Sequence, residues 1–171
     1  FERAKWLCSS TPGMVCTEQV TKGLAQARYG IYHSYLMVAE KAIQNGRLDI
    51  AGIYINQSME YQKQNSAEII SNSESIQWMG ILCKEYVMLG NTLNQKKQYD
   101  QAIIEFNKCD SISKVYPTIG EVKGCKSGLC GARNGVYNNM LDGARSKLST
   151  DQLDAAEEKC NQAIAYQHMY K

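Results

Sequence analysis

The chain contains an internal repeat with a displacement of 51 residues. Residues 35–58 and residues 86–109 match at their aromatic, small and acidic positions. Such a repeat predicts one structural unit that occurs more than once, each copy covering the hydrophobic face of its neighbour. The aligned pairs are Tyr35 with Tyr86, Met37 with Met88, Ala39 with Gly90, Leu48 with Tyr99, Asp49 with Asp100, Ala51 with Ala102, and Ile55 with Phe106.

Each copy has the pattern of a helical hairpin. A small residue follows the first aromatic by one turn, and a second small residue follows twelve positions later, where two helices can approach closely. A short polar break lies between them, Asn45-Gly46 in the first copy and residues 96–98 in the second. Large residues then recur at helical spacing, which predicts the inner face of a second helix.

This pattern resembles the tetratricopeptide-repeat family. The resemblance implies an all-α fold of three antiparallel hairpins in a short right-handed α-solenoid, and it implies that partners bind in a concave groove. The copy at residues 83–116 carries the motif as Tyr86, Leu89, Gly90, Leu93, Tyr99, Ala102, Phe106 and Cys109. The weaker copy at residues 32–65 carries it as Tyr35, Val38, Ala39, Ala42, Gly46, Leu48, Ala51, Ile55 and Ser58.

A third copy is present with about three residues inserted at positions 146–150. Tyr137 aligns with Tyr86 at a displacement of 51, whereas Leu153, Asp154, Ala156, Cys160 and Ala163 align with the second copy at 54. The patterns Ser71-x-x-Glu74 and Ser149-x-x-Gln152 predict helix starts. We therefore expect a single domain over residues 1–171, with hairpins at about 12–70, 72–114 and 132–171 and a linker loop at 115–131.

The cysteines predict an oxidising compartment. Seven cysteines are many for a reducing cytosol, and the chain begins without methionine, so we expect an exported protein, extracellular or periplasmic, whose signal peptide has been removed. Seven is an odd number, which leaves at least one thiol without an internal partner. We expect at least two disulfides, with Cys125 or Cys130 stapling the linker loop. The candidates are Cys8, Cys16, Cys83, Cys109, Cys125, Cys130 and Cys160.

Several functional classes lack support in the sequence. The net charge of +2 and the scattered basic residues do not favour nucleic acid. No segment is apolar for long enough to span a membrane. His33 and His168 lie near opposite ends without a nucleophile beside them, so we predict no enzyme and no small-molecule substrate. Neither close C-x-x-C pairs nor a phosphate-binding glycine motif occurs, so no metal and no cofactor are expected.

The two ends of the chain carry apolar and aromatic residues where a repeat array needs a polar cap. We therefore expect a structural subunit that stacks on copies of itself, end to end, into an extracellular filament. The alternative is an exported adaptor that binds a peptide or partner protein in its concave groove. The expected interface residues are Phe1, Trp6, Leu7, Ile164, Tyr166, Met169 and Tyr170.

Overall fold

The computed structural model of the chain describes residues 2–11 and 18–170 and is all-helical there, with no strand. The described part confirms the predicted all-α class. The helices are α1 (Glu2–Ser10), α2 (Glu18–Gln44), α3 (Leu48–Gln64), α4 (Ser73–Gln95), α5 (Tyr99–Val115), a 3₁₀ turn η1 (Pro117–Ile119), α6 (Cys125–Ser149) and α7 (Leu153–Met169).

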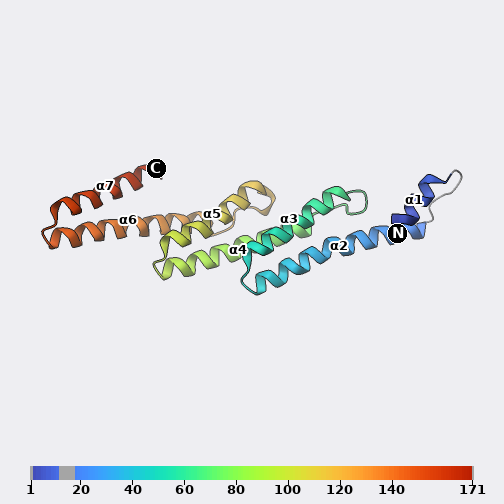
Figure 1. Cartoon of the computed structure of the whole chain (residues 1–171), viewed down its shortest axis with the longest axis horizontal. Coiled ribbons are helices and arrows are strands. Elements are labelled where there is room, and N and C mark those ends of the chain that lie inside the picture. The colour runs from blue at the N-terminus through green and yellow to red at the C-terminus, as the bar shows by residue number, and fades with distance from the viewer. Residues whose placement is uncertain (1, 12–17, 171) are drawn as a thin grey trace. The chain divides into compact units, whose positions relative to one another are not determined.

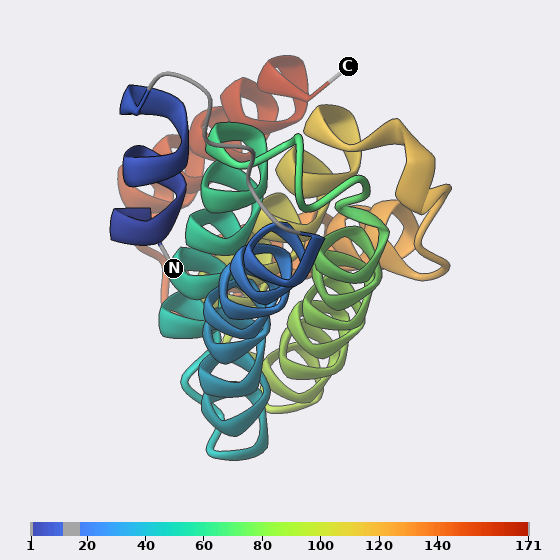
Figure 2. The same cartoon turned by 90° about the vertical axis from the view of Figure 1, so that its right-hand side faces the viewer.

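The chain divides into two compact units, Phe1–Leu82 and Cys83–Lys171, where the sequence predicted one domain. The division falls inside α4. In the first unit α2 and α3 lie side by side as one hairpin, in both views (Figure 1 and Figure 2). In the second unit α6 contacts both α5 and α7, and α6 and α7 form the last hairpin.

A network of three hydroxyls lies at the centre of the first unit. The hydroxyls of Tyr32, Ser58 and Ser75 come from α2, α3 and α4; the Ser75 Oγ lies 2.8 Å from each of the other two oxygens. Ser58 also donates to the carbonyl of Ile55 at 2.6 Å. All three side chains are almost fully buried, and each finds a partner, so the burial of these polar groups is compensated.

The second unit is built around Phe106 of α5, which is fully buried. Its ring lies against Gly90 of α4 and Gly128 of α6, where an added Cβ would stand 2.9 Å and 2.3 Å from the ring atoms. Tyr99 occupies a similar place against Gly135, with a corresponding distance of 2.4 Å. The glycines are therefore what lets α4 and α6 approach the two rings.

The three hairpin turns share one backbone feature at equivalent positions of the repeat. Gly46, Lys97 and Asp151 all have a positive φ, of 68°, 61° and 61°. These residues are displaced by 51 and then 54 positions, as the sequence alignment predicts. The three-residue insertion lengthens α6, which ends at Ser149.

The predicted linker loop at 115–131 is too long. Residues 125–131 are the first two turns of α6, and only residues 116–124 connect it to α5. Gly128 and Gly131 fall within the predicted loop but lie in the helix. Gly124, with a φ of 94°, is the residue just before it.

The predicted disulfide staple of this segment is not formed. Cys125 is buried and Cys130 is exposed, and both are free. Five positions along a helix turn a side chain through about 140°, so the two sulfurs point apart. Cys8, Cys83, Cys109 and Cys160 are also free, and Cys16 lies outside the described residues.

Of the two predicted helix caps, one is found in part. Ser71 Oγ accepts a hydrogen bond from the Ser73 backbone N–H at 3.1 Å, just ahead of α4. Ser149, by contrast, is the last residue of α6, and its hydroxyl donates to the carbonyl of Ser146. The predicted box at Ser149 and Gln152 is therefore wrong, because the inserted residues extend α6 through Ser149.

Candidate functional site

An apolar groove runs between the two helices of the last hairpin. It has a volume of about 370 Å³ and lies where α6 ends and α7 begins. Leu148 and Leu153 are 60% and 59% exposed, which is high for leucines that flank a buried pair of alanines. The groove is lined by Leu141, Ala144, Arg145, Leu148, Leu153, Ala156, Glu157 and Cys160.

The groove corresponds, in the repeat, to the surface of α4 and α5 on which α6 packs. Leu141 corresponds to Gly90 at a displacement of 51, and Leu153 and Cys160 correspond to Tyr99 and Phe106 at 54. In the second hairpin Gly128 of α6 lies against Phe106, and Gly135 of α6 lies against Tyr99. In the last hairpin, no helix of the described residues occupies the same place.

A line of exposed residues on α2 corresponds, in the repeat, to the faces of α4 and α6 that pack on the preceding hairpin. Buried residues of α4 and α6 correspond at a displacement of 50, as with Leu82 and Ala132, and α2 aligns with α4 at 51. Ile31 is therefore the equivalent of Leu82, which is fully buried against Gly52, yet Ile31 is 45% exposed. We define the α2 stripe as the exposed residues Ala27, Ile31, Ser34 and Val38.

The predicted interface residues lie on α1 and α7. Trp6 and Leu7 are 64% and 45% exposed, and α1 contacts α2, with an ion pair of 2.6 Å between Glu2 and Arg28. Ile164 is 52% exposed and follows Cys160 by one turn, so it continues the groove along α7. Phe1 lies outside the described residues.

The other predicted residues of α7 gather at its C-terminal end. Met169 is 70% exposed. The rings of Tyr166 and Tyr170 lie 4.9 Å apart, and the Arg133 guanidinium stands 4.0 Å from the Tyr170 ring. Tyr166 is half-buried, and burial raises the pKa of its hydroxyl. These tyrosines therefore also hold α7 against α6, in addition to any role at an interface.

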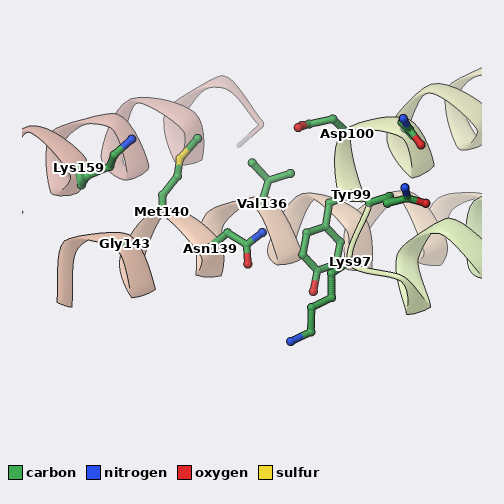
Figure 3. A pocket seen from close by; sticks show the side chains of 10 residues that line it. Lys97, Tyr99, Asp100, Val136, Asn139, Met140, Gly143 and Lys159 are labelled. Carbon is green, nitrogen blue, oxygen red and sulfur yellow. The ribbon is translucent and has the colours of Figure 1, made fainter. Parts of the chain in front are cut away.

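A second cavity, polar in character, lies between the turn after α4 and the last hairpin (Figure 3). Its volume is about 460 Å³. Lys97 and Lys159 stand on opposite sides of Asn139 in the view of Figure 3, with Tyr99 near Lys97. Two ammonium groups, one carboxylate from Asp100 and several amides line it, so it offers hydrogen bonds of both kinds to a polar ligand.

Three buried thiols gather in the second unit, one from each of α4, α5 and α6. Cys83 and Cys109 are fully buried and Cys125 is 4% exposed. The Cys83 thiol donates to the Cys109 carbonyl at 3.8 Å, and the Cys125 thiol donates to the Phe106 carbonyl at 3.4 Å. The Cys109 side chain interacts with both of the other thiols. Its interaction with Cys83 lowers the pKa of Cys83 and, together with burial, raises the pKa of Cys109, whereas the interaction with Cys125 lowers the pKa of Cys109. Burial raises the pKa of Cys125 to about 12.

The histidines do not form a catalytic arrangement in the described residues. His33 Nδ1 lies 3.1 Å from a carboxylate oxygen of Glu74 and its ring stacks on Tyr29, on an exposed part of the first unit. His168 lies in the last turn of α7. Among residues 2–11 and 18–170, no group of three metal-binding side chains could hold an ion, and no helix is long and apolar enough to cross a membrane.

Sequence reasoning found the repeat and missed the groove. The signal was present: the alignment of Leu153 with Tyr99 places a large apolar residue where the preceding copy is covered by the next helix. No family model, no curated protein and no solved structure matches the chain. Function is therefore inferred from the residues of this chain alone.

Proposed function

We propose that the protein is a non-catalytic, tetratricopeptide-like structural subunit that assembles head to tail with copies of itself. The observation that carries this proposal is the pair of matching surfaces. The groove on α6 and α7 repeats the surface that a following helix covers elsewhere in the chain, and the α2 stripe repeats the helix face that does the covering. A second copy of the chain therefore offers the α2 stripe to this groove, and the equivalents of these two surfaces already pack together within one chain.

The chemistry of the two surfaces suits this contact. Ala27 and Ser34 align with Gly128 and Gly135, the residues through which α6 approaches Phe106 and Tyr99. Small residues at these positions let a helix backbone enter the groove, while Ile31 and Val38 add apolar area that is now 45% and 40% exposed. Covering exposed leucines and isoleucines stabilises the contact by about 25 cal/mol per Å² buried, less the cost of association.

The assembly is open-ended in this proposal. The groove and the stripe are different surfaces, so the contact is heterologous, and a heterologous contact that does not close into a ring continues as a filament. Trp6 and Leu7, on the helix beside the stripe, and Ile164, which extends the groove, would lie at the edge of the interface.

Complementary variants test this arrangement. Ile31→Glu leaves the groove intact, and Leu153→Glu leaves the stripe intact; each places an unpaired charge in the contact. Sedimentation at tens of micromolar, well above the dissociation constant expected of a specific interface, should give polymers for the unchanged protein and monomers for each variant. A one-to-one mixture should give dimers that grow no further, because one functional groove remains for one functional stripe.

The control is Ile70→Glu, which adds the same charge at a residue that is 91% exposed and belongs to neither surface. It should assemble like the unchanged protein, and all variants should keep their helical circular dichroism. An unchanged protein that sediments as a monomer would refute the assembly. Monomers in the one-to-one mixture would refute the pairing of these two surfaces.

A second candidate function is an adaptor, and the polar cavity of Figure 3 favours it. With Lys97 and Lys159 against a single carboxylate, the cavity suits a segment of a partner protein that carries an acidic side chain. Replacing both lysines with alanine should then abolish partner binding without changing self-assembly. If the protein is a self-assembling subunit and not an adaptor, the double variant should behave like the unchanged protein in every assay.

Export is part of the proposal and rests on the number of cysteines. In an oxidising compartment the protein should carry at least one disulfide. Mass spectrometry of protein secreted from cells, alkylated under denaturing conditions and then with a second reagent after reduction, counts the bridged thiols. A full set of free thiols would argue against export.

A further inference from the structure

We propose that Cys83, Cys109 and Cys125 form a buried dithiol–disulfide site in which Cys109 is the shared member and Cys125 is the thiol that a disulfide oxidant reaches first. The site lies inside the second unit and joins α5 to either α4 or α6. It is independent of the proposed assembly, because none of its residues belongs to the groove or to the α2 stripe.

The geometry places three thiols in one buried cluster. Each comes from a different helix, and the Cys109 side chain interacts with those of both neighbours. Cys83 and Cys125 in turn contact the backbone of α5 at the Cys109 and Phe106 carbonyls. A cluster of three can hold only one bridge at a time, and the thiol left over lies beside it.

A cavity leads from the surface to this cluster. Its volume is about 330 Å³, and its walls include Cys125 and Ser113 together with residues of the loop before α6. Two charged pairs flank it: Lys114 with Asp110 at 2.5 Å, and Lys126 with Glu121 at 3.3 Å. Cys125 is the one thiol of the three that lines this cavity, so a small disulfide molecule contacts it before the other two.

The chemistry balances with a small-molecule disulfide such as oxidised glutathione as the oxidant. The Cys125 sulfur, having lost its proton, attacks one sulfur of the oxidant, forming a mixed disulfide and releasing one reduced thiol. The Cys109 sulfur, also deprotonated, then attacks the Cys125 sulfur and releases the second. The protein gives up two protons and two electrons in total, and the oxidant takes both as two thiols.

The leftover thiol allows the bridge to move. When Cys109 is bonded to Cys125, the Cys83 thiolate can attack Cys109, form a Cys83–Cys109 bridge and return Cys125 to the thiol form. No oxidant is consumed in this exchange. The result is a bridge within the α4–α5 pair instead of one between α5 and α6.

Peptide mapping tests the site directly. The unchanged protein is incubated with millimolar oxidised glutathione, alkylated while denatured, and digested with trypsin without reduction. Cleavage after lysine separates the three cysteines, so the bridge should appear as residues 109–114 joined to 124–126, or as 109–114 joined to 64–84. The oxidised protein should melt on the order of 5–15 °C higher than the reduced protein.

Variants separate the roles of the three thiols. Cys109→Ser should abolish both linked peptides, and Cys83→Ala should keep the link to 124–126. Cys125→Ala should slow the link to 64–84 at least tenfold, because the accessible thiol is gone. The exposed Cys130 and Cys160 serve as controls: Cys130→Ala and Cys160→Ala should leave the mapping unchanged.

Two outcomes would overturn the site. One is an oxidised sample in which Cys130 or Cys160 carries glutathione, proving that the oxidant acted, while neither linked peptide forms. The other is a direct link between 64–84 and 124–126 in the unchanged protein, which would show that Cys109 is not the shared member. Circular dichroism of each variant checks that the fold is retained, so that a missing link reflects the missing sulfur.

Discussion

Replacing Gly128 with alanine should destabilise the second unit, although the same change in most helices is stabilising. A Cβ at this position would lie 2.3 Å from Cε1 and 2.4 Å from Cζ of Phe106, about 1 Å inside an ordinary contact. The ring has little room to retreat, because the same ring atoms also lie against Gly90, where an added Cβ would stand at 2.9 Å. Relief therefore requires α6 to shift or Phe106 to leave its rotamer.

The magnitude follows from two opposing effects. Overpacking of this depth costs about 3 kcal/mol, at the upper end of the usual range. Alanine regains about 1 kcal/mol over glycine through its helix propensity. The net loss in the free energy of unfolding should be about 2 kcal/mol, measured by urea titration in reductant at one fixed protein concentration.

Gly131 provides the matched control, since it lies in the same helix and an added Cβ would stand 3.6 Å from the Asn94 side chain, an ordinary contact. Gly131→Ala should therefore stabilise by about 0.5–1 kcal/mol. In a Phe106→Leu background the overpacking cost should nearly vanish, so Gly128→Ala should stabilise by about 1 kcal/mol, which gives a coupling energy of about 3 kcal/mol. If Gly128→Ala proves as stable as Gly131→Ala, the close packing of α6 on Phe106 is refuted.

Three further predictions concern the core, the turns and the thiols. Ala102 is fully buried, so Ala102→Leu should lower the free energy of unfolding by roughly 1–3 kcal/mol, whereas Gln101→Leu on the exposed face should change it by less than about 0.5 kcal/mol in urea titrations. Asp151 has a φ of 61°, so Asp151→Gly should raise the melting temperature by relieving about 1 kcal/mol of backbone strain, while Ser149→Gly, at the end of α6, should not. The initial rate of bridge formation, followed by the linked peptide, should rise about tenfold per pH unit between about pH 7 and 9, because only the thiolate of Cys125 attacks. The pKa of Cys125 is raised to about 12, first by burial and then by Cys109 and Asp110, and Lys126 lowers it by less. A rate that is flat over this range would show that Cys125 is not the attacking thiol.

The sequence predicted the helices because the repeat is carried by local patterns. The spacing of Tyr86, Gly90, Ala102 and Phe106 reports which residues share a helix face, and the polar break before Tyr99 reports where one helix ends. Both are properties of short stretches of chain. The hairpin turns, the all-α fold class and the three-residue insertion before Leu153 could therefore be predicted from the sequence.

The loop and the disulfides could not be predicted in this way because they depend on packing between distant segments. Gly128 looks like a loop glycine until Phe106 is placed against it. Cys125 and Cys130 look like a pair because they are close in sequence, yet the helix turns their side chains apart and brings Cys125 to Cys109 instead. The groove was missed for the same reason, since the exposed Leu153 is recognised as unusual only by comparison with the half-buried Tyr99, which lies against Gly135.

The two units use equivalent positions for different chemistry. Tyr32 and Ser58 in the first unit correspond to Cys83 and Cys109 in the second at a displacement of 51, and Ser75 corresponds to Cys125 at 50. Hydroxyls at these positions form short hydrogen bonds, which hold three helices together whatever the redox conditions. Thiols form longer and weaker ones but can be joined covalently. The same packing register therefore gives the first unit a central hydroxyl cluster that oxidants leave unchanged and the second unit a thiol cluster in which, in our proposal, an oxidant adds a covalent link between helices.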